Sequence, residues 1–151
     1  MTAIEITRGD PRSNEAKNLL EQSHALMQSL YSPDECHYLE IDALCVESIH
    51  FFVAKLDGKT LGCAALANKG NYGEIKSMFV DPAARGSGIA NRLMTTLIED
   101  AKAQGLSLIC LETGDVLAAA HKLYERHGFV KCGPFGDYVE CDASVFMKKT
   151  L

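Results

Sequence analysis

The segment Arg85-Gly86-Ser87-Gly88-Ile89-Ala90 has the composition of an anion-binding loop. Its small residues let backbone N–H groups approach a phosphate, whereas larger side chains would obstruct that approach. A helix predicted to begin at about Gly88 adds unpaired N–H donors and the positive end of its dipole. The pattern therefore predicts a pyrophosphate site, although an ordinary glycine-containing turn before a helix has the same composition.

Two elements must position this loop. The run 74–80 is typical of a strand and ends at Asp81-Pro82. After the loop, a helix is predicted over about 88–104, with Gly105 at its C-terminal cap. Its apolar face consists of Leu93, Met94, Leu97, Ile98 and Ala101. We therefore expect the loop between a strand and a long helix.

The N-terminal half of the chain predicts a strand, two helices and a hairpin. Residues 3–8 alternate as in a strand, and apolar residues recur at helical spacing over about 16–31. Ser32-Pro33-Asp34-Glu35 then has the cap, first-turn proline and capping-box glutamate of a second, short helix. Asp57-Gly58 separates two β-branched and aromatic runs within 50–66 and predicts an antiparallel hairpin.

The C-terminal part predicts a strand over 106–113, a helix over 116–127, and final strands around 130–132 and 144–147. The resulting order is β-α-α-β-β-β-α-β-α-β-β, which we interpret as a single domain over residues 1–151. A mixed sheet with helices on both faces places it in the α+β class, as a layered α/β domain.

The net charge of the chain disfavours nucleic acid as a partner. The chain has 151 residues, with 15 Lys and Arg against 20 Asp and Glu and a net charge of −5. This balance disfavours a broad phosphate-binding surface, so no nucleic acid is expected as a partner. An acidic surface would favour a cationic substrate such as an amine, but mild negative charge also serves solubility. Because the N-terminus has no basic stretch with an apolar core, and no long apolar run follows, we expect a cytoplasmic protein without membrane contact.

The six cysteines are expected to be free thiols. They show no C-x-x-C spacing, and several lie in apolar runs where a reduced thiol packs as a small hydrophobic group. The five histidines show no metal-ligand spacing with them, so no metal is expected. No pattern of His or acidic partners indicates a nucleophilic cysteine.

Three blocks of the chain resemble the GCN5-related N-acetyltransferase (GNAT) family. Arg85-x-x-Gly88-x-Ala90 is similar to the family's cofactor motif, R/Q-x-x-G-x-G/A. Glu74 stands eleven positions ahead of Arg85, as the family's catalytic glutamate stands ahead of its loop, and residues 120–129 are similar to A-x-x-L-Y-x-x-x-G-F. Residues 133–147 also resemble a subgroup of small bacterial acetyltransferases that end in PFGDY…SVFM.

The resemblance implies a mixed, mostly antiparallel sheet of six to seven strands and an enzyme that moves an acetyl group from acetyl-CoA to a primary amine, by direct attack in a ternary complex. An amine is mostly protonated near neutral pH, so the reaction needs a base for the amine and an acid for the thiolate. By resemblance, Glu74 is the base and Tyr124 is the acid. The alternatives are a solvent-facing glutamate at a strand end and a core tyrosine. Glu112 could assist on the acceptor side, although a glutamate at a strand end is more often on the surface.

By the same resemblance, the cofactor extends from the loop to the two strands before and after it. The pantetheine arm is expected between Met78-Phe79-Val80 and the strand that ends at Thr113, where it would pair with backbone groups as an added strand does. A backbone N–H of that edge could polarise the thioester carbonyl. The expected cofactor-binding residues are Met78, Phe79, Val80, Arg85, Gly86, Ser87, Gly88, Ile89, Ala90, Thr113 and Tyr124. Where many family members have a cofactor-binding asparagine, this chain has Leu117, so that contact is in question.

On the acceptor side, Phe135 and Tyr138 are expected to bind the substrate, because the hairpin joining the last strands crosses that side of the family's fold. A tight Gly-Pro-Phe-Gly turn is the alternative. The implied acceptor is a small-molecule amine or a peptide amine, and the exposed edges of such a sheet are compatible with a homodimer. Two other interpretations stay open: an acetyl-CoA-binding sensor without turnover, and a partner-binding domain whose loop is coincidental.

Overall fold

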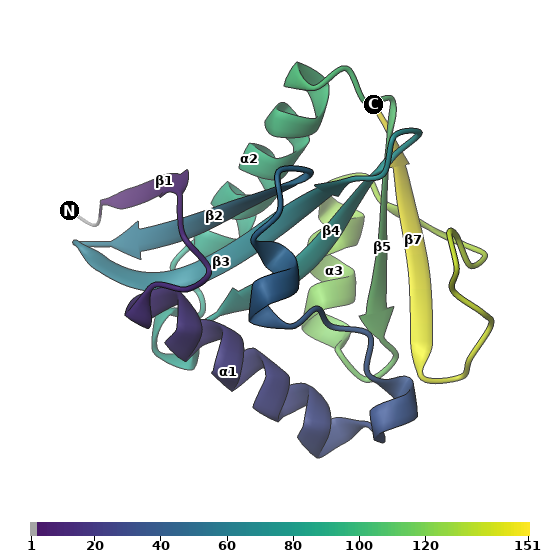
Figure 1. Cartoon of the computed structure of the whole chain (residues 1–151), viewed down its shortest axis with the longest axis horizontal. Coiled ribbons are helices and arrows are strands. Elements are labelled where there is room, and N and C mark those ends of the chain that lie inside the picture. The colour runs from purple at the N-terminus through teal and green to yellow at the C-terminus, as the bar shows by residue number, and fades with distance from the viewer. Residues whose placement is uncertain (1–2) are drawn as a thin grey trace.

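The computed structural model describes residues 3–151, which form a seven-stranded sheet with helices on both faces (Figure 1). The strand order is β1-β2-β3-β4-β5-β7-β6. The strands are β1 (Ile4–Arg8), β2 (Ile49–Leu56), β3 (Lys59–Asn68), β4 (Gly73–Val80), β5 (Leu108–Gly114), β6 (Val130–Cys132) and β7 (Ser144–Thr150). Strands β4 and β5 are parallel and all other neighbours are antiparallel, which confirms the mixed, mostly antiparallel sheet. Met1 and Thr2 of the predicted domain lie outside the described residues.

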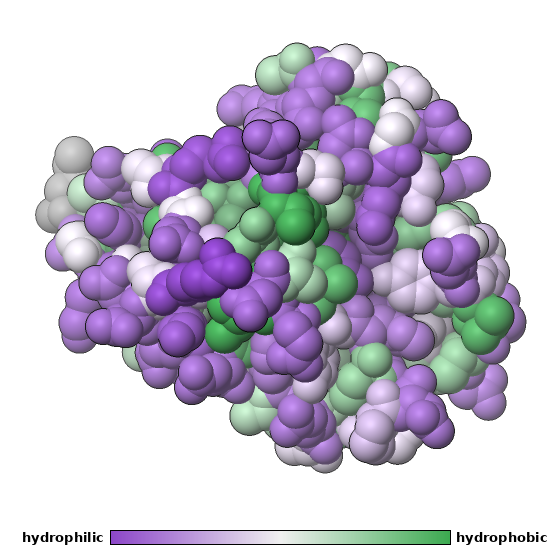
Figure 2. All heavy atoms as spheres, in the orientation of Figure 1, coloured by the Kyte–Doolittle hydropathy of each residue, from purple (hydrophilic) through white to green (hydrophobic). Residues whose placement is uncertain are grey.

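The sheet separates two core layers, and helices cover each of them. They are α1 (Asn14–Leu30), α2 (Ile89–Ala103) and α3 (Ala118–Arg126). One buried cluster joins Leu19 and Leu20 of α1 to the sheet, and a second joins Leu93 of α2 and Leu123 of α3 to the opposite face. On the face that carries α1, hydrophilic side chains predominate and hydrophobic ones gather near the middle (Figure 2). None of the helices within residues 3–151 has the length and apolarity needed to cross a bilayer.

Local sequence explains the turns that the chain uses. Asp57 and Gly58 have φ values of 50° and 86°, as a two-residue hairpin of the primed type requires. Gly88 caps α2 at its N-terminus with φ 93°, and Gly105 leaves it with φ 78°. The hairpin and the helix boundaries at 88 and 105 therefore agree with the sequence prediction.

The predicted second helix is not an α-helix. Ser32 and Glu35 form the expected capping box, but only a three-residue 3-10 turn, η1 (Pro33–Glu35), follows it. Cys36 already has extended backbone, with φ −90° and ψ 124°. The cap is present, but the backbone is already extended at Cys36, so the turn does not propagate into a helix. A second 3-10 turn, η2 (Ile41–Leu44), completes this connection to β2.

The two parallel strands pair over a short distance and then separate. Pairing between β4 and β5 covers only residues 73–75 and 109–111. Farther along β4, the pairing with β3 changes register between Cys63 and Ala65, and Ser77 has a positive φ of 55°. Such a bulge bends a strand away from its regular course. Figure 1 shows β4 and β5 close together at their beginnings and splayed apart at their ends, near α1.

Candidate active site

A cavity of about 160 Å³ lies where the ends of β4 and β5 separate, and we name it the cleft. Its walls come from α1, the segment after η1, β4, β5 and α3. The wall includes His37, Lys76, Met78, Glu112, Thr113 and Tyr124. A larger hollow of about 470 Å³ beside η1 shares Tyr38 with the cleft but lies outside the gap between the strands. We therefore place the site in the smaller cleft.

The loop after β4 has a backbone shaped for an anion. Gly86 and Gly88 both have left-handed φ values, 82° and 93°. A side chain on Gly86 would meet no atom within 4 Å, so its glycine serves the backbone conformation and leaves open space in front of it. The buried hydroxyl of Ser87 has no hydrogen-bond partner within residues 3–151, and Gly88 caps α2 without a side chain. Free N–H donors and an unpaired hydroxyl at a helix N-terminus fit a pyrophosphate.

Tyr124 is fixed in the cleft wall by α3. The residue is 6% exposed, and its ring packs at a tilt against Phe129 with 6.0 Å between centroids. Burial, followed by the charge of Glu112, raises the pKa of Tyr124 to about 12. Its hydroxyl is therefore protonated at neutral pH.

Glu74 is the centre of a polar network that we define as Glu74, Lys76, Tyr138 and the carbonyl oxygen of His37. The Tyr138 hydroxyl donates to Glu74 Oε2 at 2.6 Å, and Lys76 Nζ lies 3.3 Å from the same oxygen. Lys76 Nζ also donates to the Tyr138 hydroxyl and to His37 O, both at 2.9 Å. Glu74 is 4% exposed and does not reach the cleft wall, whereas Lys76 does. The network thus ties β4 to two connecting segments.

Glu112 lies on β5, the parallel neighbour of the strand that carries Glu74 and Lys76. Ser144 Oγ of β7 donates to Glu112 Oε2 at 2.8 Å. Burial raises the pKa of Glu112, while the Ser144 hydrogen bond and the nearby His37 and Lys76 act in the opposite direction. The carboxyl group of Glu112 therefore loses its proton at a higher pH than that of a glutamate in water.

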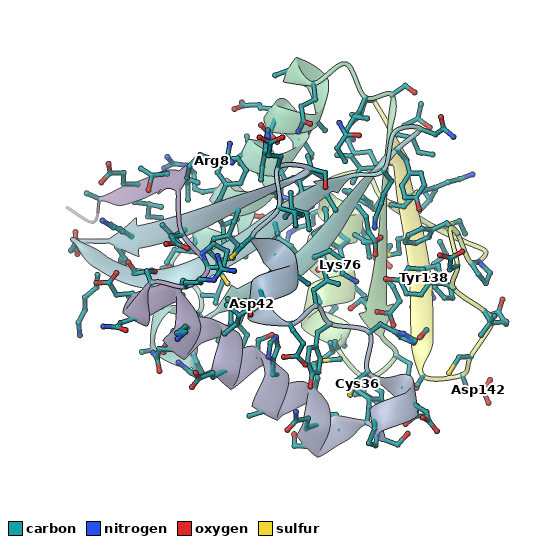
Figure 3. All side chains as sticks on the ribbon, viewed as in Figure 1. Arg8, Cys36, Asp42, Lys76, Tyr138 and Asp142 are labelled. Atoms are coloured by element: carbon teal, nitrogen blue, oxygen red, sulfur yellow. The ribbon has the colours of Figure 1, made fainter. Side chains whose placement is uncertain are left out.

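Aromatic rings from the 133–143 segment pack beside the polar network. Phe135 packs edge-on against Tyr138, with centroids 5.0 Å apart, and against Phe146 of β7 at 5.8 Å. Burial, followed by the hydrogen bond to Glu74 and its charge, raises the pKa of Tyr138. Figure 3 shows Lys76 and Tyr138 on the same face of the sheet. The rings and the polar network together form a wall beside the cleft.

The structure brings together part of the predicted set. Met78, Thr113 and Tyr124 line the cleft, and Leu117 lies there as well. Phe79 is buried on the α1 side and pairs with Cys63 on β3, while Val80 pairs with Gly62. Sequence reasoning missed three residues in or beside the cleft, namely His37, Lys76 and Ser144.

Of the missed residues, Lys76 had a signal in the sequence, because it lies two positions after Glu74 and so on the same strand face. His37 lies in an irregular connection and Ser144 opens a strand that the chain reaches 70 residues after Glu74. No periodicity relates either residue to the cleft.

Comparisons with known proteins point to one family. Residues 17–129 match the acetyltransferase (GNAT) family. The chain is 39% identical to an IAA acetyltransferase from Azospirillum brasilense over the full length of both. It is 38% identical to the N-acetylaspartate synthetase of Danio rerio, over 69% of this chain and 36% of that protein. A crystal structure described as an acyl-CoA N-acyltransferase from Klebsiella pneumoniae superposes with a TM-score of 0.82 at 27% identity, covering 98% of this chain and 97% of the other.

Proposed function

The chain belongs to the acetyltransferase (GNAT) family and is an acetyl-CoA-dependent N-acetyltransferase, and from this premise we propose that it acetylates a primary amine by direct attack in a ternary complex. The observation that carries the proposal is the cleft between the splayed ends of β4 and β5. It combines an unpaired strand edge, a protonated phenol and a carboxylate within one small cavity. A donor and an acceptor that meet there need no covalent intermediate on the protein.

The donor side would be held mainly by backbone. We propose that residues 85–90 hold the pyrophosphate of acetyl-CoA, because this loop offers free N–H donors at the start of α2. Beyond Ile75 the edge of β4 has no pairing with β5, so the backbone of 78–80 and of Thr113 is available to the pantetheine arm. The bound cofactor supplies the activated thioester.

Tyr124 is proposed to protonate the leaving thiolate. It lies in the cleft wall and is protonated at neutral pH, so a proton is present where the C–S bond breaks. Placing an acid at the leaving group speeds such a reaction by about 10²- to 10⁴-fold.

A base must also take a proton from the acceptor ammonium. By resemblance to the family, Glu74 is predicted to be this base, and that role stays a prediction. Replacement of Glu74 by Gln tests it, because a missing base flattens the rise of rate with pH while acetyl-CoA affinity stays intact. An unchanged pH profile in that variant excludes Glu74.

We propose that the acceptor is a small-molecule or peptide amine, bound beside Phe135 and Tyr138 on the aromatic wall. The first acceptors to assay are L-aspartate, a peptide with a free N-terminus and a lysine-containing peptide. L-aspartate is included because of the relatives named N-acetylaspartate synthetase. Formation of coenzyme A thiol that depends on the added amine identifies an acceptor.

Calorimetric titration of acetyl-CoA tests the donor site. The wild-type protein should bind it, and Gly88→Glu should abolish binding because a carboxylate would repel the pyrophosphate. Gly58→Glu is the matched control: its φ of 86° carries the same strain and charge, in a hairpin where an added side chain meets nothing within 4 Å. Wild-type protein that does not bind acetyl-CoA would contradict the proposal.

Two further proposals concern the whole protein. We propose that it acts in the cytoplasm and forms a homodimer through an exposed edge of the sheet, β1 or β6. Sedimentation across a range of concentrations tests the dimer, and a mass that stays monomeric excludes it.

A further inference from the structure

Two carboxylates lie on one face of the sheet, one on each of the two parallel strands. Glu74 of β4 is in register with Cys110 of β5, and Glu112 follows Cys110 by two residues. Because side chains two residues apart on a strand share a face, Glu74 and Glu112 both point toward the α1 side. Either could serve as a base, so their surroundings must decide between them.

Both carboxylates accept a hydrogen bond through Oε2, but of the two only Glu112 faces the cleft. Glu74 accepts the Tyr138 hydroxyl and pairs with Lys76 through the same oxygen, and it stands off the cleft wall. Glu112 is in that wall together with Met78 and Tyr124, the residues expected beside the thioester. Ser144 donates to Oε2 of Glu112, which leaves Oε1 able to accept a proton.

We infer that Glu112 is the general base that takes the proton from the acceptor ammonium, and that Glu74 is a positioning residue that holds Lys76 and Tyr138 in the wall. The inference rests on the proposed function and competes with the prediction that Glu74 is the base. Geometry supports it, since a base must come within hydrogen-bond reach of the proton it removes.

The step balances in atoms and charge. An N–H bond of the acceptor ammonium breaks and an O–H bond forms at Glu112 Oε1. The freed nitrogen lone pair forms the C–N bond with the acetyl carbonyl carbon, and the electron pair of the breaking C–S bond goes to sulfur. Tyr124 gives its proton to that sulfur, and the second proton lost by the nitrogen restores Tyr124. Glu112 then releases its proton to solvent, so each turnover yields one amide, one thiol and one free proton.

The surroundings of Glu112 suit the role of a base. The charged and titratable groups around it are Glu74 and Lys76 on β4, His37 on the connection before β2, and Tyr124 on α3. Burial is the largest influence and raises the pKa of Glu112. A carboxylate with a raised pKa is a stronger base once ionised, and it is ionised above that pKa.

The decisive experiment compares Glu112→Gln with the matched variant Glu74→Gln, using the amine that the acceptor assay identifies. Glu112→Gln should lower kcat/KM about 100-fold at pH 7 and remove the rise of rate with pH, while acetyl-CoA affinity and thermal stability stay near wild type. Glu74→Gln should keep the rise of rate with pH. The reverse pattern, with the rise lost only in Glu74→Gln, would overturn the inference.

A second measurement is independent of turnover. In protein labelled with ¹³C at glutamate carboxyl carbons, the resonance absent from Glu112→Gln belongs to Glu112. Its titration midpoint should lie above the ordinary value of about 4.3 and coincide with the kinetic midpoint. A midpoint that does not match the kinetic midpoint would overturn the inference. Failure of wild-type protein to bind acetyl-CoA would instead overturn the proposed function, so the two failures are distinguishable.

Discussion

The proposed donor and acceptor sides of the cleft are built by different means. The donor side depends on backbone: two left-handed glycines, the start of α2 and the unpaired edge of β4. The acceptor side depends on side chains from distant parts of the chain, which meet in the polar network of Glu74, Lys76, Tyr138 and His37 O. A backbone site should tolerate loss of a side chain, whereas a network of buried polar groups should not.

The largest effect is expected from Lys76→Met. The side chains of Lys76 and Glu74 are only 10% and 5% exposed, so the variant leaves a buried carboxylate without its cation. Breaking such a pair typically costs about 3–5 kcal/mol of unfolding free energy, which urea denaturation would measure. The double variant Lys76→Met/Glu74→Gln removes both charges and should recover part of the loss. A single variant as stable as wild type would mean that the network is not structural.

Tyr124→Phe should come next. Loss of the proton donor is expected to lower kcat/KM about 100-fold, equivalent to about 2.7 kcal/mol, with the Kd of acetyl-CoA unchanged. Steady-state kinetics and calorimetry on the same preparation separate the two quantities. Full turnover at saturating substrates would exclude the acid role.

Tyr138→Phe should have a smaller effect, located on the acceptor side. The change removes a hydroxyl that donates to Glu74 and accepts from Lys76, so about 2 kcal/mol of stability is expected to be lost. The KM for the amine should rise while the KM for acetyl-CoA stays constant. Equal changes in the KM for the amine and the KM for acetyl-CoA would show that the acceptor and donor sides of the cleft do not act separately.

The smallest effect is expected from Ser87→Ala in the loop. Its hydroxyl is the one loop side chain that is buried without a partner within residues 3–151. If backbone donors dominate, losing this group should weaken acetyl-CoA binding by roughly threefold at most. A loss of a hundredfold in calorimetry would mean that the donor side depends on side chains too.

The same difference explains what the sequence could predict. The loop around Gly88, the hairpin at Asp57-Gly58 and the apolar stripe of α2 are determined by residues close together in the chain, and all appear as expected. The polar network joins residues 37, 74–76 and 138, which local patterns do not relate to one another. The predicted helix after Ser32 was wrong, because a capping box is a local signal that starts a turn and does not by itself propagate it into a helix.

The short pairing of β4 with β5 has a mechanical consequence. Strands β1–β4 and strands β5–β7 are two half-sheets that share backbone hydrogen bonds only along residues 73–75 and 109–111. Beyond Ile75, the β4 amide hydrogens that point away from β3 should therefore exchange with solvent faster than the β4 amide hydrogens that are bonded to β3. An arm of cofactor that pairs with this edge would extend the seam between the half-sheets, and exchange would slow along it. The ligand would then act as a removable strand that stiffens the protein while it is bound.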